Sequence, residues 1–228
     1  LRTVAVLGGG SAGWLVAGLL AAEHPDLRIT LIESSEVPVI GVGEGTWPTM
    51  RDTLRRTGVT ETDFIRECDA AFKQGSKFLR WREDRDDDYY HHPFVLPTGY
   101  LDTNLVAGWM AHSDVPFSML TCLQSPLCEA GKSPKQFATP EWASVANYSY
   151  HLDAAKLGVF MRRHCVERLG VRHVSDHMTG VEAHDNGDIA ALQTREHGAI
   201  AGDLFVDCSG MRALLIGQHY GVEIESQK

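Results

Sequence analysis

The first residues of the chain that could do chemistry are the glycines of GGGSAG at residues 8–13, which match the pattern Gly-x-Gly-x-x-Gly. In this pattern the first glycine permits a tight turn, the second lets the backbone approach a pyrophosphate, and the third lets a helix pack closely on a strand. The N–H groups at the start of that helix attract the phosphate charge. The predicted cofactor-binding residues of this loop are Gly8, Gly10, Ser11, Ala12 and Gly13.

The elements around the loop agree with this prediction. The apolar run Val4–Leu7 is typical of a buried parallel strand, residues 12–23 predict a helix, and Arg28–Glu33 predicts a second strand. Glu33 therefore ends the strand beside the loop, where a carboxylate accepts a hydrogen bond from a ribose 2′-hydroxyl and disfavours a 2′-phosphate. The pattern predicts a dinucleotide site and is compatible with both FAD and NAD.

Two further segments carry chemistry that the residues alone leave open. The loop GVGEGTWP at residues 41–48 can approach a ligand closely or form an ordinary surface turn. Lys73 and Lys77 lie near the predicted end of a helix, where a lysine usually complements the helix dipole and stays solvated. A buried lysine, in contrast, becomes a nucleophile because burial lowers its pKa.

The histidine and cysteine patterns do not predict a metal site. His91 and His92 are adjacent residues, which rarely reach one ion, and no spaced ligands accompany them; a surface loop is the alternative. The five cysteines contain no Cys-x-x-Cys pair and indicate reduced thiols in the cytoplasm. Cys208 is expected to be a packed thiol.

Composition narrows the class of protein. The chain has 228 residues and a formal charge of -9, which argues against nucleic acid as a partner and against a polybasic membrane patch. No window contains the roughly 18 uninterrupted apolar residues of a membrane span. We therefore expect a cytoplasmic protein that binds a small molecule.

The remaining elements follow from periodicity and turn residues. We expect helices at about 47–57 and 61–73, the second with a capping box at Thr60 and Asp63. Further along the chain, the expected elements are a strand at 77–81, a solvated loop at 84–88, an irregular segment at 89–146, a helix at 153–169, a strand pair at 173–184 and 189–194, and a strand at 204–207.

These elements predict an α/β fold, a doubly wound, Rossmann-like domain with an inserted substrate-side segment. The expected division is a dinucleotide-binding part at 1–81, the insertion at 82–150 and the return of the first domain at 151–228. The chain begins on Leu1 and stops soon after the signals of a strand, a turn and a helix. We expect it to be part of a longer protein.

Six segments together resemble the flavin-dependent tryptophan and indole halogenases, in the order in which that family has them. They are GGGSAGW at 8–14, GVGEGTWP at 41–48, FKQGSKF at 72–78, HHPF at 91–94, YHLDA at 150–154 and DLFVDCSG at 203–210. The resemblance covers nearly the whole chain but is poor between about residues 95 and 146. It implies the FAD-binding portion of such an enzyme, with the GR2-type fold.

The resemblance also implies a reaction. Reduced FAD (FADH2), supplied by a separate flavin reductase, would react with O2 and a halide ion to give hypohalous acid. The acid would pass to a lysine beside a small aromatic substrate, and electrophilic substitution would follow. The family's segment places that lysine at Lys73 and makes Lys77 structural. A homodimer stays open.

Other site residues are implied in the same way. Val42, Gly43 and Glu44 match the family's flavin strap, and Met178 matches a position whose backbone meets the adenine. His92 and Phe94 match residues that line the substrate pocket.

Two departures bear on the substrate. The better-known tryptophan halogenases favour Ala and Ile where this chain has Gly45 and Trp47. A different indole or a larger aromatic is therefore at least as well supported as free tryptophan. The family's Trp-x-Trp-x-Ile-Pro motif, catalytic glutamate and halide loop do not occur in these residues, so we do not expect this part to catalyse alone. The alternatives are an FAD-dependent monooxygenase or reductase of the same fold, and an FAD-binding module without catalysis.

Overall fold

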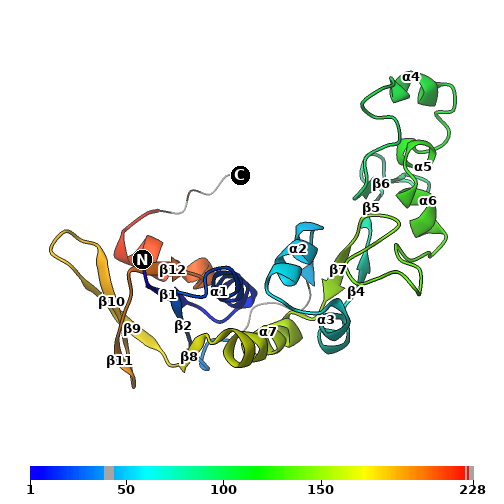
Figure 1. Ribbon diagram of the computed structural model, residues 1–228. Helices are drawn as coiled ribbons and strands as arrows, with labels where there is room; N and C mark the ends of the chain where they lie inside the picture. The colour runs from blue at the N-terminus through cyan, green and yellow to red at the C-terminus, as the bar shows by residue number, and fades with distance from the viewer. Residues whose placement is uncertain (39–43, 224, 226–228) are drawn as a thin grey trace. The chain divides into compact units, whose positions relative to one another are not determined.

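The computed structural model describes residues 1–38, 44–223 and 225 (Figure 1). The chain divides into two compact units. Unit 1 comprises Leu1–Gly43, Thr53–Asp69 and Asp153–Lys228, and unit 2 comprises Glu44–Asp52 and Ala70–Leu152. Residues 44–52 and 70–81, which the sequence grouped with the dinucleotide-binding part, thus lie in unit 2.

Unit 1 is built on a parallel sheet with the strand order β12-β1-β2-β8. The strands are β1 (Thr3–Leu7), β2 (Arg28–Glu33), β8 (Arg172–Ser175) and β12 (Leu204–Asp207). Val4–Leu7 is buried along its whole length, as expected for a central strand covered on both faces. The helix α1 (Ser11–Glu23) joins β1 to β2 and packs against α7 (Ala154–Leu169). The predicted α/β class is confirmed.

A second, antiparallel sheet of unit 1 contains β9 (Met178–Ala183), β10 (Ile189–Thr194) and β11 (Gly198–Ala201). The predicted hairpin turn around Gly187, which has φ +89°, is confirmed. The predicted strand at 173–184 is wrong in its continuity, because the chain leaves β8 before it enters β9. The Asp176 carboxylate causes the break by accepting backbone N–H groups of His177 and of the loop between β10 and β11.

Helix ends in unit 1 follow their capping residues. The Asp153 side chain accepts the N–H of Lys156 at 2.9 Å and starts α7, which Gly170 ends at φ +70°. Thr60 caps α3 (Glu61–Glu67) by accepting the N–H of Asp63 at 3.1 Å. Both predicted starts are confirmed.

Unit 2 contains two small antiparallel sheets and three short helices. β7 (Ser149–Leu152) lies between β3 (Glu44–Gly45) and β4 (Ala71–Lys73), and β5 (Gly75–Leu79) pairs with β6 (Tyr89–Pro93). The helices are α4 (Leu105–Met110), α5 (Phe117–Thr121) and α6 (Gln124–Glu129), all within the segment predicted to be irregular. The helix α2 (Thr49–Arg56) spans the division between the two units.

The helix predicted at 61–73 is wrong beyond Glu67. The Cys68 N–H closes the last turn on Phe64, and Asp69 has φ +47°, which a continuing helix does not allow. Residues 71–73 then pair with β7, so strand pairing outweighs the helical periodicity of this segment. Lys73 therefore lies on a strand, and Gly75 begins β5 instead of ending a helix.

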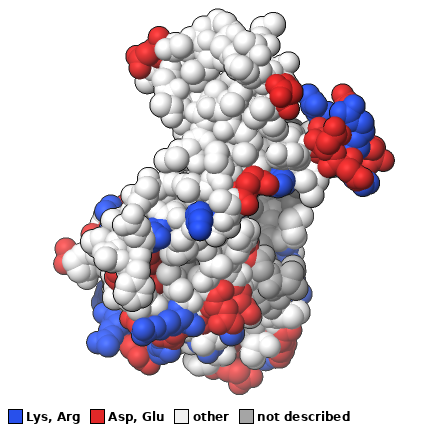
Figure 2. Space-filling model, turned by 90° about the vertical axis from the view of Figure 1, so that its right-hand side faces the viewer, with Lys and Arg blue, Asp and Glu red and all other residues white. Residues whose placement is uncertain are grey.

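Surface charge and helix length bear on which partners the protein can have and on whether its helices can cross a membrane. On the face in Figure 2, Lys and Arg side chains lie among Asp and Glu side chains and form no single basic patch. None of the helices in the described residues is long and apolar enough to cross a membrane.

Candidate functional site

The backbone geometry of the glycine loop of unit 1 requires glycine at two of its positions, Gly8 and Gly13. Gly8 has φ +118°, and a Cβ there would lie 2.2 Å from the Cys208 carbonyl oxygen. A Cβ on Gly13 would lie 1.8 Å from the Gly8 carbonyl oxygen. The first turn of α1 can therefore pack against the loop only because residue 13 is glycine. Gly10 differs, because a Cβ there would meet no atom within 4 Å.

The open space beside Gly10 lies at the start of α1. Gly10 is the N-cap of that helix, Ser11 and Ala12 begin its first turn, and that turn carries no acidic residue. Free N–H groups and the helix dipole favour an anion at such a place. The loop therefore fits the pyrophosphate of a dinucleotide.

Glu33 lies directly beside the loop. A Cβ on Gly9 would lie 1.6 Å from Glu33 Oε2. The carboxylate, whose side chain is 20% exposed, receives Trp14 Nε1 at 3.3 Å and lies 2.8 Å from His173 Nε2 and 3.5 Å from Arg162. Because a carboxylate has about four acceptor positions, it can also accept a ribose hydroxyl. The sequence did not indicate these three partners, which come from α1, α7 and β8.

The end of β12 holds a second carboxylate. Asp207 accepts the N–H and hydroxyl of Ser209 and the N–H groups of Leu215 and Ile216 at 2.5 to 3.1 Å. Burial alone would raise its pKa, but these donors hold the pKa below its ordinary value. Burial and the Asp207 charge raise the pKa of Cys208, which is consistent with a packed thiol and not with a nucleophile.

Four predicted cofactor residues have less structural context. Val42 and Gly43 lie outside the described residues. Glu44 is exposed and pairs with Leu152 at the edge of unit 2. Met178 begins β9, where its backbone pairs with Thr194 and its side chain packs against the apolar core of unit 1. Their contacts with a cofactor stay predictions.

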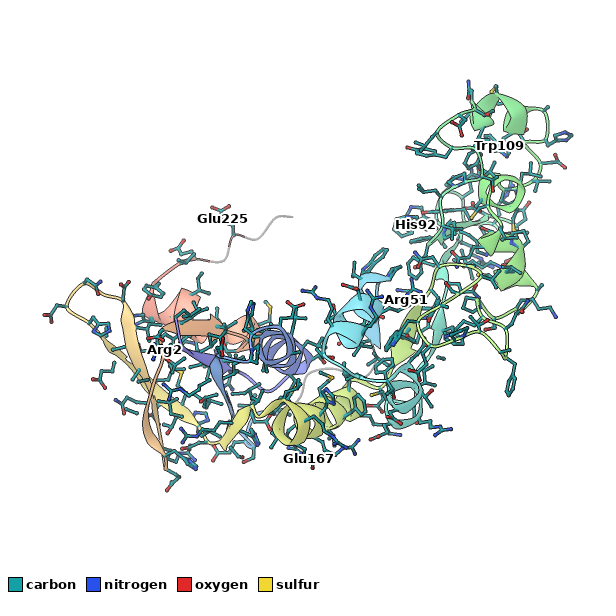
Figure 3. All side chains as sticks on the ribbon, viewed as in Figure 1. Arg2, Arg51, His92, Trp109, Glu167 and Glu225 are labelled. Atoms are coloured by element: carbon teal, nitrogen blue, oxygen red, sulfur yellow. The ribbon has the colours of Figure 1, made fainter. Side chains whose placement is uncertain are left out.

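In unit 2 the structure brings together three residues that the resemblance implied. Lys73 Nζ lies 5.6 Å from the centre of the Phe94 ring and 5.4 Å from that of Trp47. The Trp47 ring lies 5.6 Å from Phe94 and 6.3 Å from His92, which is labelled on β6 in Figure 3. The sequence did not predict Trp47 as a site residue, although its identity marked it as a departure from the family.

The alternation of side chains along β4 explains why Lys73 points toward Trp47 and Phe94. Phe72 packs against Tyr148 and Tyr150, which are both fully buried. The neighbouring Lys73 therefore points to the other face of β4, toward Gly45.

The partner strand of β5 is placed by Gly75. This residue has φ +142°, and a Cβ there would lie 2.4 Å from the His92 carbonyl oxygen. Adjacent residues of β6 then face opposite ways: His92 contacts Trp47, and His91 contacts Glu129. In the described part of the chain no three His, Cys, Asp or Glu side chains are placed to hold a metal ion.

Phe94 is fixed through its backbone. Its N–H donates to Gln124 Oε1 at 2.7 Å, and its carbonyl accepts Asn147 Nδ2 at 3.0 Å. Gln124 is completely buried, and Arg51 of α2, which is labelled in Figure 3, donates to Asn147 Oδ1 at 2.5 Å. These residues are 23 to 96 positions apart in the sequence, and no local motif marked them.

Lys77 has a different environment from Lys73. Its Nζ lies 2.7 Å from Glu129 Oε1 and 4.4 Å from the centre of the Tyr89 ring. His91 Nε2 lies 2.8 Å from the same carboxylate oxygen. The hydrogen bond from Lys77 lowers the pKa of Glu129, and His91 lowers it further. Lys77 is thus held in an ion pair that connects β5 to α6.

Comparison with known proteins identifies the family. A family model described as "Tryptophan halogenase" matches residues 3–228. The chain is 35% identical over 96% of its length to the tryptophan 6-halogenase ThaL of Streptomyces albogriseolus, and 33% identical over 94% to the tryptophan 7-halogenase RebH of Lentzea aerocolonigenes. It spans only 44% and 43% of those two proteins.

Solved structures agree with these matches. The crystal structure of a tryptophan halogenase from Shewanella frigidimarina superposes with a TM-score of 0.94 at 44% identity, over 99% of this chain and 46% of that one. A flavin-dependent halogenase from Xanthomonas campestris gives a TM-score of 0.86 at 36% identity, over 100% of this chain and 46% of its own.

Proposed function

Since the chain belongs to the tryptophan halogenase family, we propose that the full-length protein halogenates an electron-rich aromatic compound such as tryptophan, an indole or a related ring. The reaction consumes FADH2, O2 and a halide ion. Hypohalous acid reaches Lys73, which holds the acid beside the substrate by a hydrogen bond, or whose neutral amine takes the halogen as a haloamine and releases water. Electrophilic substitution on the ring then releases a proton.

One observation carries this proposal: the surroundings of Lys73. Its Nζ lies near the rings of Trp47 and Phe94, and within the described residues it forms no hydrogen bond or ion pair. An amine without a carboxylate partner is available to a reagent, and aromatic walls suit a planar substrate. Lys77, four residues later, forms an ion pair with Glu129, and this supports a structural role for Lys77.

The residues of unit 1 fit FAD as the cofactor. Gly8, Gly10 and Gly13 with the first turn of α1 would hold the pyrophosphate, and Glu33 would accept the ribose hydroxyl. Val42, Gly43 and Glu44 of the strap and the backbone of Met178 are proposed as further contacts. When bound in its reduced form, FADH2 would supply the two electrons that activate oxygen.

We propose two features of the cellular setting. A separate flavin reductase supplies FADH2. The protein works in the cytoplasm, where its five cysteines stay reduced; all five are free thiols. The homodimer stays a prediction.

The test uses the full-length protein with FAD, a flavin reductase, NADH, oxygen and chloride or bromide, offered tryptophan and a panel of indoles. Mass spectrometry should find a product that carries halogen, and omission of the reductase should abolish it. Rapid NADH oxidation without the reductase, with a hydroxylated product, would show a monooxygenase instead. FAD binding without any product would show a module that has lost catalysis.

A further inference from the structure

We infer that Trp47 is a positioning residue for the lysine chemistry, and that its ring and the ring of Phe94 together hold the Lys73 ammonium in place. The inference rests on the proposed function of Lys73. It assigns to the segment before α2 a role in placing the reactive amine, in addition to any contact of that segment with a cofactor.

The first argument is the geometry around Nζ. A cation within about 6 Å of an aromatic centroid is attracted by the negative face of the ring, and tryptophan gives the strongest attraction. Lys73 Nζ lies 5.4 Å from the centre of the Trp47 ring and 5.6 Å from the centre of the Phe94 ring. Since Nζ has no hydrogen bond or ion pair with any described residue, these two rings are the groups there that restrain it.

The second argument is that one residue of β7, Ser149, positions the backbones of both Lys73 and Trp47. Ser149 lies opposite Lys73 in the β4–β7 pairing. Its hydroxyl, which is completely buried, donates to the Trp47 carbonyl at 2.6 Å. The Trp47 backbone and the Lys73 backbone are therefore tied to the same point, although 26 positions separate them in the sequence. Trp47 as a residue is 56% exposed, so apolar burial alone does not account for the place of its ring.

The third argument is the space left by Gly45. A Cβ at this position would lie 3.2 Å from Lys73 Nζ and 3.5 Å from His151 Nδ1. Gly45 has no Cβ, and the ammonium occupies the space beside it. A methyl group there would push the amine by a few tenths of an ångström.

The test compares four variants of the full-length protein. Trp47→Leu removes the aromatic face and keeps an apolar side chain, whereas Trp47→Phe keeps a smaller face. Gly45→Ala crowds Nζ. Tyr89→Leu is the matched control, because it removes the ring 4.4 Å from the structural Lys77.

Two measurements follow. The first is kcat and KM for halogenated product. The second is the NMR signal of ¹³C-dimethylated Lys73, assigned by its loss in Lys73→Ala; ring currents from Trp47 and Phe94 should shift it upfield. We expect Trp47→Leu to lower kcat roughly 3- to 30-fold and to reduce the upfield shift. Trp47→Phe should restore most of both, Gly45→Ala should move the signal, and Tyr89→Leu should leave kcat within about twofold.

The outcomes separate the inference from the proposed function. If Trp47→Leu keeps kcat and the Lys73 signal, Trp47 does not position the amine. If KM rises while kcat and the signal stay unchanged, Trp47 is only a wall for the substrate, and the inference is wrong. If Lys73→Ala itself retains product formation, the proposed function fails first.

Discussion

The glycine loop of unit 1 and the lysine site of unit 2 are built from different kinds of constraint. In the loop, backbone atoms exclude side chains: a Cβ on Gly8 or Gly13 would lie 2.2 or 1.8 Å from a carbonyl oxygen. Around Lys73, side chains from separate strands and loops converge, and the centres of the Trp47 and Phe94 rings lie 5.4 and 5.6 Å from Nζ.

Under the proposed function, this difference separates cofactor binding from halogen transfer. A backbone loop depends on few side chains, so it should hold its cofactor when residues of unit 2 change. The lysine site depends on individual side chains, so a single substitution should remove its chemistry and leave cofactor binding intact.

Lys73→Ala should give the largest effect. Product formation should fall by roughly 10³-fold or more, because no other amine would hold the halogen beside the ring. FAD content and oxygen consumption should stay close to the wild-type values, since the loop of unit 1 is unchanged. The assay is chromatographic quantification of halogenated indole, with flavin absorbance as the folding check. Near-normal product yield would refute the proposed mechanism.

Gly10→Val tests the other side. A Cβ at Gly10 meets no atom within 4 Å, and its φ of -74° is open to any residue, so the variant should fold. The new side chain would occupy the pyrophosphate position and should weaken FAD binding roughly 100-fold or more. A loss of this size is at the upper end of what a single substitution at the centre of a binding site causes. Calorimetric titration with FAD measures this.

The control for that titration is the melting temperature of the Gly10→Val protein without FAD. It should match that of the wild type, because the folded apoprotein has room for the side chain. Unchanged FAD affinity in a folded variant would show that the cofactor lies elsewhere.

Asp207→Asn should have a smaller effect, on stability. The amide replaces one carboxylate oxygen by a donor that faces N–H groups, so about two hydrogen bonds are lost and unfolding should become easier by about 1.5–3 kcal/mol. The folded pKa of Asp207 is depressed, so its charge contributes stability above the unfolded pKa of about 3.9.

That contribution is lost as the pH falls through the depressed folded pKa. The difference between wild type and Asp207→Asn should therefore be constant between pH 7 and 5 and shrink below about pH 4. Urea unfolding followed by circular dichroism at several pH values measures it. A difference that grows toward acid would mean that the carboxylate is not stabilised by these donors.

The same division explains what the sequence could predict. The strands β1 and β2, the helix α1 and the roles of Gly8 and Gly13 follow from local patterns, because short-range sterics determine the loop. The end of α3 could not be predicted in this way, because pairing with β7, some 78 positions away, decides that residues 71–73 form a strand.

The Gln124 and Asn147 bonds to Phe94 had no sequence signal either, since each joins segments that only the folded chain brings together. The resemblance supplied Lys73, His92 and Phe94 as a set before any geometry was available. It could not supply Trp47 as a partner of Lys73, because that contact depends on residues in which this chain departs from the family's pattern.

Lys77→Ala should give the smallest effect and sharpens the contrast between the two lysines. The substitution removes an ion pair with Glu129 in which the two side chains are 38% and 35% exposed, and such pairs contribute about 0–1 kcal/mol. His91 keeps its contact with the same carboxylate, so the link between β6 and α6 persists. Product formation should stay within about twofold of wild type, since Lys77 and His91 lie on the face of β5–β6 opposite His92.

Parallel urea unfolding and product assays of Lys77→Ala and Lys73→Ala measure this contrast. A loss of product in Lys77→Ala comparable to that in Lys73→Ala, with unchanged stability, would show that the ion-paired lysine takes part in halogen transfer and that the division between the two lysines is wrong.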